Sequence, residues 1–238
     1  TEAYYFLPQM QTKIMNEGWA TYWHSKLMTE HMCSADDIFE YADRCAGVLA
    51  TQPGQLNPYK LGVELFRYIE DRWNRGCFGK AWEDCDDLAA RRNWNQNIGA
   101  SQEKIFEVRK IYNDLTFIDE FLTPDFVADQ KLYSFGFNDK RGRFEVESRA
   151  FSEVKSKLLT ALTNGGQPVV SVIDANHGNR GELLLEHHHD GVDLRMDWAK
   201  EVMEALQRVW KRPVQLHTIV EQKPYVLRFD GTDHIQTA

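Results

Sequence analysis

Residues 8–32 constrain the fold of this chain more than any other run, because they predict a helix that is apolar or aromatic on nearly every side. One face carries Met10, Ile14, Glu17, Thr21, His24 and Met28, and another carries Met15, Trp19, Tyr22, Trp23 and Leu27. Pro8 suits a first helical turn and only Gly18 interrupts the pattern, so we expect one long helix. A helix of this kind packs among several others, in the middle of a domain.

Glu17 is the exception on this helix. Beside Ile14 and Trp19 its carboxylate is predicted to be desolvated, which requires a cation, a metal or several hydrogen-bond donors. Gly18 costs about 1 kcal/mol relative to Ala in a helix interior, which predicts that another backbone or a ligand approaches closely beside Glu17. His24 lies seven residues on, roughly 20° round the same face and about 10 Å along the axis, so both side chains could point into one cavity.

This separation makes joint chelation of one ion awkward, so we expect Glu17 to be a metal ligand and His24 a catalytic neighbour that orients a ligand, water or substrate. If an ion binds at Glu17, His24 and His31 are the first residues to consider as further ligands. The residues alone leave another interpretation open, in which Glu17 is only a buried carboxylate bonded to an arginine or to backbone amides.

The rest of the first half also predicts helices. Ser34 and Asp37 form a variant of the capping box before a helix over 35–50, whose acidic side reads as solvated surface rather than a second metal site. Asn57 and Pro58 begin a helix that Gly76 ends. Shorter helices are expected over 86–92, from 101 and over 117–122.

The apolar period changes from helical to alternating between Pro124 and Lys131. Residues 132–137 and 143–147 predict a hairpin across the turn 138–142, and the order from there is ββαββαββ. The later elements are helices over 153–162 and 197–210, and strands over 168–174, 181–187, 214–220 and 225–229. The second of these helices is amphipathic, and the residues expected to face inward are Trp198, Val202, Ala205, Leu206 and Val209. We therefore predict an α+β protein with a helical domain over 1–128 and an α+β domain over 129–238, with helices on one face of a mainly antiparallel sheet.

A histidine cluster ends one of these strands. Alternation sends His187 and His189 to one face and His188 to the other, with His177 in the turn before them. Such a pair can bind a transition metal, although polar surface is the commoner role of histidines at a strand end.

Composition limits the partners. The 238 residues contain 28 Lys and Arg against 36 Asp and Glu, a formal charge of −8, which does not support a nucleic-acid or anionic-membrane partner. No apolar run reaches the ~20 residues that span a bilayer. Cys33, Cys45, Cys77 and Cys85 lack metal-site spacing and indicate reduced thiols in a cytoplasmic protein.

The blocks NEGWATYWH at 16–24 and NPYKLGVELFRYIEDRW at 57–73 closely resemble the C-terminal half of the stage V sporulation protein R (SpoVR-like) family. The same EGWA-type helix resembles the third-ligand helix of gluzincin-like zinc peptidases, which implies a helical, zinc-peptidase-like first domain and Glu17 as a zinc ligand. In those enzymes two histidines on an earlier helix complete the site. The family's own motif resembles H-x-x-G-H, without the usual general base, so the resemblance implies a metal site more strongly than peptide cleavage.

The chain starts at Thr1, so we expect a fragment whose partner is the missing N-terminal half of the same chain. Zinc is then expected only in the full-length protein, and none in this fragment. The resemblance implies a sporulation protein that acts in spore cortex formation, with a vestigial or active zinc-hydrolase-like site. The alternative is a non-enzymatic regulatory or assembly protein that acts with a serine kinase and a von Willebrand factor A type protein.

Overall fold

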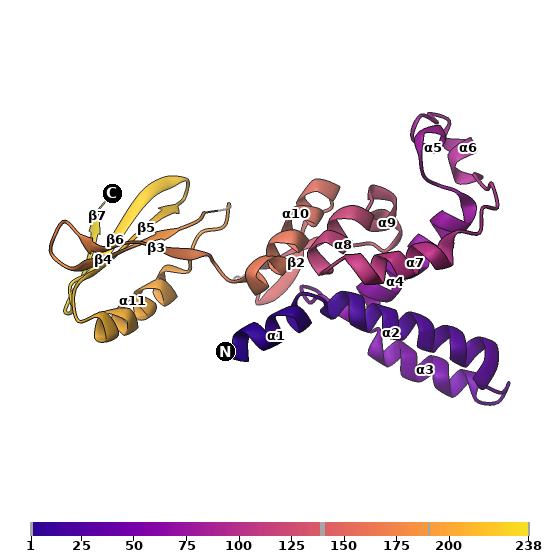
Figure 1. The fold of residues 1–238 in the computed structure, drawn as a ribbon, viewed down its shortest axis with the longest axis horizontal. Coiled ribbons are helices and arrows are strands. Elements are labelled where there is room, and N and C mark those ends of the chain that lie inside the picture. The colour runs from indigo at the N-terminus through magenta and orange to yellow at the C-terminus, as the bar shows by residue number, and fades with distance from the viewer. Residues whose placement is uncertain (1, 139–140, 190, 238) are drawn as a thin grey trace. The chain divides into compact units, whose positions relative to one another are not determined.

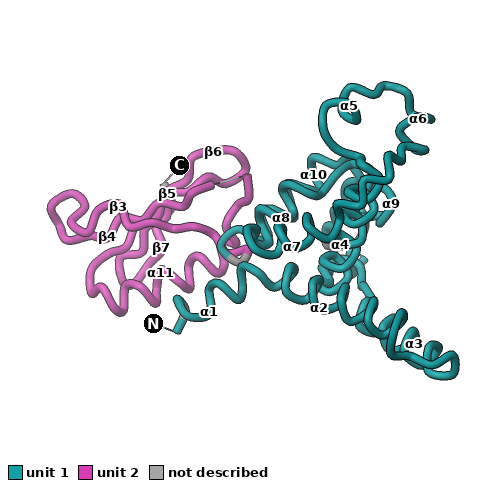
Figure 2. The backbone as a smooth tube through the Cα atoms, turned by 45° about the vertical axis from the view of Figure 1, so that its right-hand side comes forward, with its two compact units in different colours: residues 1–165 teal, residues 166–238 magenta. Residues whose placement is uncertain are grey.

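The computed structural model describes residues 2–138, 141–189 and 191–237, and the chain divides into two compact units, 1–165 and 166–238 (Figures 1 and 2). Unit 1 is mostly helical, and unit 2 packs one long helix on a sheet. The predicted α+β class is confirmed. Among the described residues, no helix combines the length and the apolar character needed to cross a bilayer.

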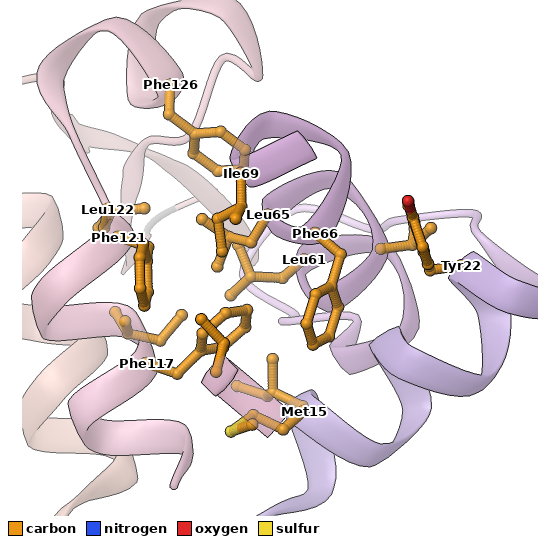
Figure 3. Packing of buried hydrophobic residues seen from close by; sticks show 14 of the residues in the cluster. Met15, Tyr22, Leu61, Leu65, Phe66, Ile69, Phe117, Phe121, Leu122 and Phe126 are labelled. Carbon is orange, nitrogen blue, oxygen red and sulfur yellow. The ribbon is translucent and has the colours of Figure 1, made fainter. Parts of the chain in front are cut away.

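Unit 1 places its core around α4 (Pro58–Arg75). Asn57 caps this helix by accepting from the Lys60 amide at 3.2 Å, and Gly76 ends it in the left-handed conformation at φ 73°, so both predicted ends are confirmed. The buried face of α4 meets aromatic side chains of α8 (Asp114–Phe121) and α9 (Pro124–Asp129), as Figure 3 shows. The other helices are α1 (Glu2–Met10), α2 (Lys13–Leu27), η1 (Met28–Met32), α3 (Ile38–Val48), α5 (Lys80–Glu83), α6 (Leu88–Arg92) and α7 (Ser101–Ile111).

The run 8–32 is not one helix. Pro8 lies inside α1, the chain turns at Gln11 and Thr12, and α2 begins at Lys13 and continues as a π-helix, η1, to Met32. A carboxylate a hundred residues away caps the new start, since Asp114 accepts hydrogen bonds from the first amides of α2. The predicted single helix is therefore wrong. The break could not be predicted from the neighbouring sequence, because the residue that caps α2 is distant in the chain.

The hairpin β1 (Ser134–Asn138) and β2 (Arg143–Ser148) is present and forms a sheet of its own; its predicted turn residues 139 and 140 lie outside the described part. Together with α10 (Phe151–Leu162) it belongs to unit 1, because Val154 is part of the helical core. The chain therefore divides into its compact units after residue 165, at the 3-10 turn η2 (Thr163–Gly166), whereas the sequence placed the domain boundary at 128/129.

The elements of unit 2 are β3 (Val170–His177), β4 (Glu182–His187), α11 (Met196–Trp210), β5 (Val214–Val220), β6 (Lys223–Phe229) and β7 (His234–Thr237). The five strands form one sheet in the order β3-β4-β5-β6-β7. The parallel pair β4 and β5 is joined by α11, and the other neighbours are antiparallel, as expected for a mainly antiparallel sheet. The last strand was not predicted.

The inward face of α11 differs from the expected one. The sequence favoured Trp198, Val202, Ala205, Leu206 and Val209, but among these only Leu206 packs against the core. The helix instead buries Met203, with Met196, Ala199 and Leu206 beside it, while Trp198, Val202 and Val209 are exposed. Both sets have spacings of three and four, so periodicity alone cannot choose between them.

Candidate functional site around Glu17

The helix that carries Glu17 is fixed at its first turn by Asp114. This carboxylate is 2% exposed and accepts from the backbone amides of Ile14 and Met15, each at 2.8 Å. Burial raises the pKa of the Asp114 carboxyl, and hydrogen bonds from backbone amides, chiefly those of Ile14 and Met15, oppose that rise. The buried carboxylate held by backbone amides is therefore Asp114, and not Glu17, for which the sequence had left that role open.

A close crossing with α4 fixes the middle of α2. A Cβ atom on Gly18 would lie 2.5 Å from the Cα of Gly62, and a Cβ on Gly62 would lie 2.3 Å from the carbonyl oxygen of Ile14. Only glycine at both positions allows the two backbones to approach this closely. The prediction that a second backbone approaches beside Glu17 is confirmed.

Glu17 itself is only partly buried, so the predicted desolvation is wrong. The phenol of Tyr59, in the first turn of α4, lies beside it, and the interaction with the Glu17 carboxylate raises the pKa of Tyr59. None of the ion pairs among the described residues includes Glu17. The carboxylate is thus reachable from solvent and its negative charge is not matched by a neighbouring side chain.

His24 contacts a different helix. Its Nδ1 lies 3.2 Å from the hydroxyl of Tyr41 on α3, and burial raises the pKa of Tyr41 to about 12. His31 is exposed on η1, with its Nε2 3.9 Å from Glu30. Among the described residues, the side chains of Glu17 and His24 therefore do not hydrogen-bond to the same residue.

Sequence reasoning missed a polar cavity of about 270 Å³ on the other side of α2. Lys26 and Glu70 form an ion pair there, with Tyr22 and Ser101 also in the lining. Burial raises the pKa of Tyr22. Lys26 is two residues after His24 and Glu70 lies within a helix rich in charged residues, so neither stood out in the sequence.

The histidines at the end of β4 each have a partner. His187 is buried with its Nδ1 2.9 Å from Thr218 Oγ1, and His189 Nε2 lies 2.7 Å from Asp193 Oδ1. The rings of His187 and His189 are 5.9 Å apart, as alternation predicts, while His188 contacts Ser171. The four cysteines carry free thiols.

A zinc ion needs three protein ligands in a catalytic site and four in a structural site. In the part of the chain that the structure describes, no three His, Cys, Asp or Glu side chains lie close enough to hold an ion. Glu17 fits the role of a single ligand, because it is a partly exposed carboxylate that lies beside the phenol of Tyr59, a group able to donate a hydrogen bond to a metal ligand. The described residues thus offer one ligand and do not form a complete site.

Comparisons with known proteins divide the chain at almost the same point as the structure. A family model described as SpoVR like protein matches residues 1–167, and one described as SpoVR-like C-terminal domain matches residues 168–221. The chain is 26% identical over 230 residues to the "Uncharacterized protein YcgB" of Escherichia coli strain K12, an overlap that covers 89% of this chain and 43% of that protein. The chain therefore spans less than half of this relative's length. No solved structure matches it significantly.

Proposed function

Because the chain belongs to the SpoVR-like family, we propose that it is part of a cytoplasmic sporulation protein that acts in spore cortex formation, and that Glu17 supplies one zinc ligand in the full-length protein. The proposal rests on the exposure of Glu17, on its lack of a cationic partner among the described residues and on the fixed position of its helix. Its carboxylate is accessible, unmatched by a cation among the described residues and held on a helix whose position is fixed at two points.

Each of these features suits a ligand. A carboxylate paired with an arginine or lysine must break that pair before it can bind a metal, and Glu17 has no such pair to break among the described residues. The phenol of Tyr59 lies beside the carboxylate and would orient it by donating a hydrogen bond, as the partners of metal ligands commonly do. The crossing of Gly18 and Gly62 leaves α2 little freedom to shift when an ion binds.

The remaining ligands would come from sequence outside these 238 residues, consistent with the resemblance to the third-ligand helix of zinc peptidases. When bound, zinc would lower the pKa of a bound water toward ~7 and polarise a substrate carbonyl. His24, exposed and two turns along α2, would contact a substrate or water rather than the ion itself.

The test uses the full-length protein purified with its native metal. We expect Glu17→Gln to fold normally and lose its zinc, because the amide keeps the shape of the side chain but not its charge. Tyr59→Phe should weaken zinc binding by about tenfold. The matched control is Glu30→Gln, an isosteric change of an exposed carboxylate on η1.

Cortex formation is tested in a spore-forming strain that lacks the gene. Wild-type and Glu30→Gln proteins should restore cortex peptidoglycan, and Glu17→Gln should not. If Glu17→Gln keeps its zinc and restores the cortex fully, Glu17 is not a ligand and the proposed site is wrong.

A regulatory or assembly role is the second candidate, and the exposed apolar side chains of two helices favour it. No described residue of α3 is buried, and Phe39 is 81% exposed. On α1, Tyr4 is 82% exposed with other large apolar residues beside it. Sequence outside these 238 residues, a serine kinase or a von Willebrand factor A type protein would cover such surfaces. Bound zinc without hydrolysis of any peptide or peptidoglycan substrate would favour this candidate.

A further inference from the structure

A cavity of about 460 Å³ opens in unit 1, between the loop over 51–56, the first turn of α4, the end of α9 and α10. Its size lies within the usual range for small-molecule sites, roughly 300–1,000 Å³. The walls are mostly apolar and include Leu61, Phe126, Leu132, Val154 and Leu158. Glu17 is not among its lining residues, so the cavity is separate from the proposed metal site.

Two contacts hold the loop that forms one wall. Gly54 has φ +78°, and a Cβ on it would lie 2.7 Å from the ring of Phe144, so the loop sits directly on β2. At the other end, the side-chain amide of Asn57 donates to the carbonyls of Val48 and Ala50, both at 2.8 Å. A wall fixed in this way favours a cavity that exists before any ligand arrives.

The charges around the cavity are unbalanced. Its lining contains three lysines, Lys60, Lys131 and Lys157, and one acid, Glu64. Lys157 is neutralised by Glu147 at 2.9 Å, and Glu64 is neutralised by Arg67 at 2.9 Å. Lys60 and Lys131 take part in no ion pair among the described residues. The cavity is therefore positive, in a chain whose formal charge is −8.

Helix formation does not account for Lys60. It is the third residue of α4, and a cation in the first turn of a helix is opposed by the helix dipole. A residue that goes against a local preference often has a functional role. Lys60 lines the cavity within reach of its apolar walls, where it could pair with an acidic group of a ligand.

We propose that this cavity binds an anionic amphiphile, with a carboxylate or phosphate head paired to Lys60 and an aliphatic body against Leu61, Phe126 and Leu158. A charged head and an apolar body match the two kinds of lining in the cavity. A cationic or neutral molecule with the same body would leave Lys60 unmatched or repelled, so charge is the property that selects the ligand.

Isothermal titration calorimetry of the full-length protein tests this with four ten-carbon probes: decanoate, decyl phosphate, decanol and decylammonium. We expect decanoate or decyl phosphate to bind at least tenfold more tightly than decanol, and decylammonium to bind most weakly. The relative affinity of the two anions tells which head group is preferred. Equal binding of all four probes, or no binding of either anion, would overturn the proposal.

Variants place the binding in the cavity. Lys60→Gln should weaken the affinity for the preferred anion about tenfold, the change expected from the loss of one charge-assisted contact. Lys60→Arg keeps the charge and should retain most of the wild-type affinity. Ala161→Phe should block binding by filling the space, since Ala161 lines the cavity and is exposed. Lys110→Gln, an exposed lysine on α7 outside the lining, is the matched control and should have no effect. Anion binding that none of the cavity variants changes would show that it occurs elsewhere.

Discussion

Replacing Gly18 by alanine should destabilise unit 1 by about 2 kcal/mol. The new methyl would lie 2.5 Å from both the Cα and the carbonyl carbon of Gly62, where carbon atoms normally stay about 3.5–4.0 Å apart, so α2 and α4 must separate by about 1 Å. The atoms in the way belong to the backbone and cannot rotate aside, which places the cost near the upper end of overpacking, about 3 kcal/mol. Alanine recovers about 1 kcal/mol of helix propensity.

Hydrogen exchange of peptides from α2, followed across a urea titration, measures this loss within unit 1. Gly47→Ala is the matched control, because Gly47 lies in α3, has no positive φ, and a Cβ added to it would have no atom within 4 Å. This variant should gain roughly 0.5–1 kcal/mol from helix propensity alone. If Gly18→Ala is as stable as the wild type while Gly47→Ala gains stability, the two helices do not cross at backbone contact.

Two substitutions and one titration test other parts of the structure. Asp114→Ala should lower stability by about 2 kcal/mol, measured by urea unfolding, since two buried amides lose their acceptor; an unchanged midpoint would mean that α2 needs no cap from α8. Arg228→Ala should lower the free energy of unfolding of unit 2 by about 2 kcal/mol in the same assay, because the buried Glu182, 3% exposed, then keeps only Arg180 as a cationic partner. An unchanged stability would mean that solvent reaches Glu182. Asp230 should titrate at about 2 by carboxyl NMR, because three hydrogen bonds from Asp233 and Thr232 lower its pKa from 3.8; its contribution to stability is then complete above pH ~4 and lost as the pH falls through about 2, and a midpoint near 3.8 would contradict those bonds.

Local signals predicted those parts of the fold that local chemistry decides. Asn57, Pro58 and Gly76 fix both ends of α4 through capping and the left-handed conformation, so the sequence suffices there. The start of α2 depends on Asp114, which is remote in sequence, and the inward face of α11 depends on which of two similar stripes meets the sheet. Periodicity carries no information about either choice.

The candidate site was predicted in the same uneven way. A glycine inside a helix lowers the stability of that helix, so its presence there indicates that another backbone approaches closely. Gly62 of α4 makes this approach to Gly18. The exposure of Glu17 could not be predicted, because it depends on how far Tyr59 and α4 cover the carboxylate. The cavity beside Lys60 joins residues from three segments, and only folding brings them together.

Anomalous diffraction at the zinc edge, from crystals of the full-length protein, tests directly whether Glu17 binds the metal. A peak about 2.0–2.2 Å from a Glu17 carboxylate oxygen, absent from Glu17→Gln crystals, is the result we predict. A zinc peak elsewhere, with Glu17 bonded only to Tyr59 and the same peak in Glu17→Gln crystals, would contradict the assignment.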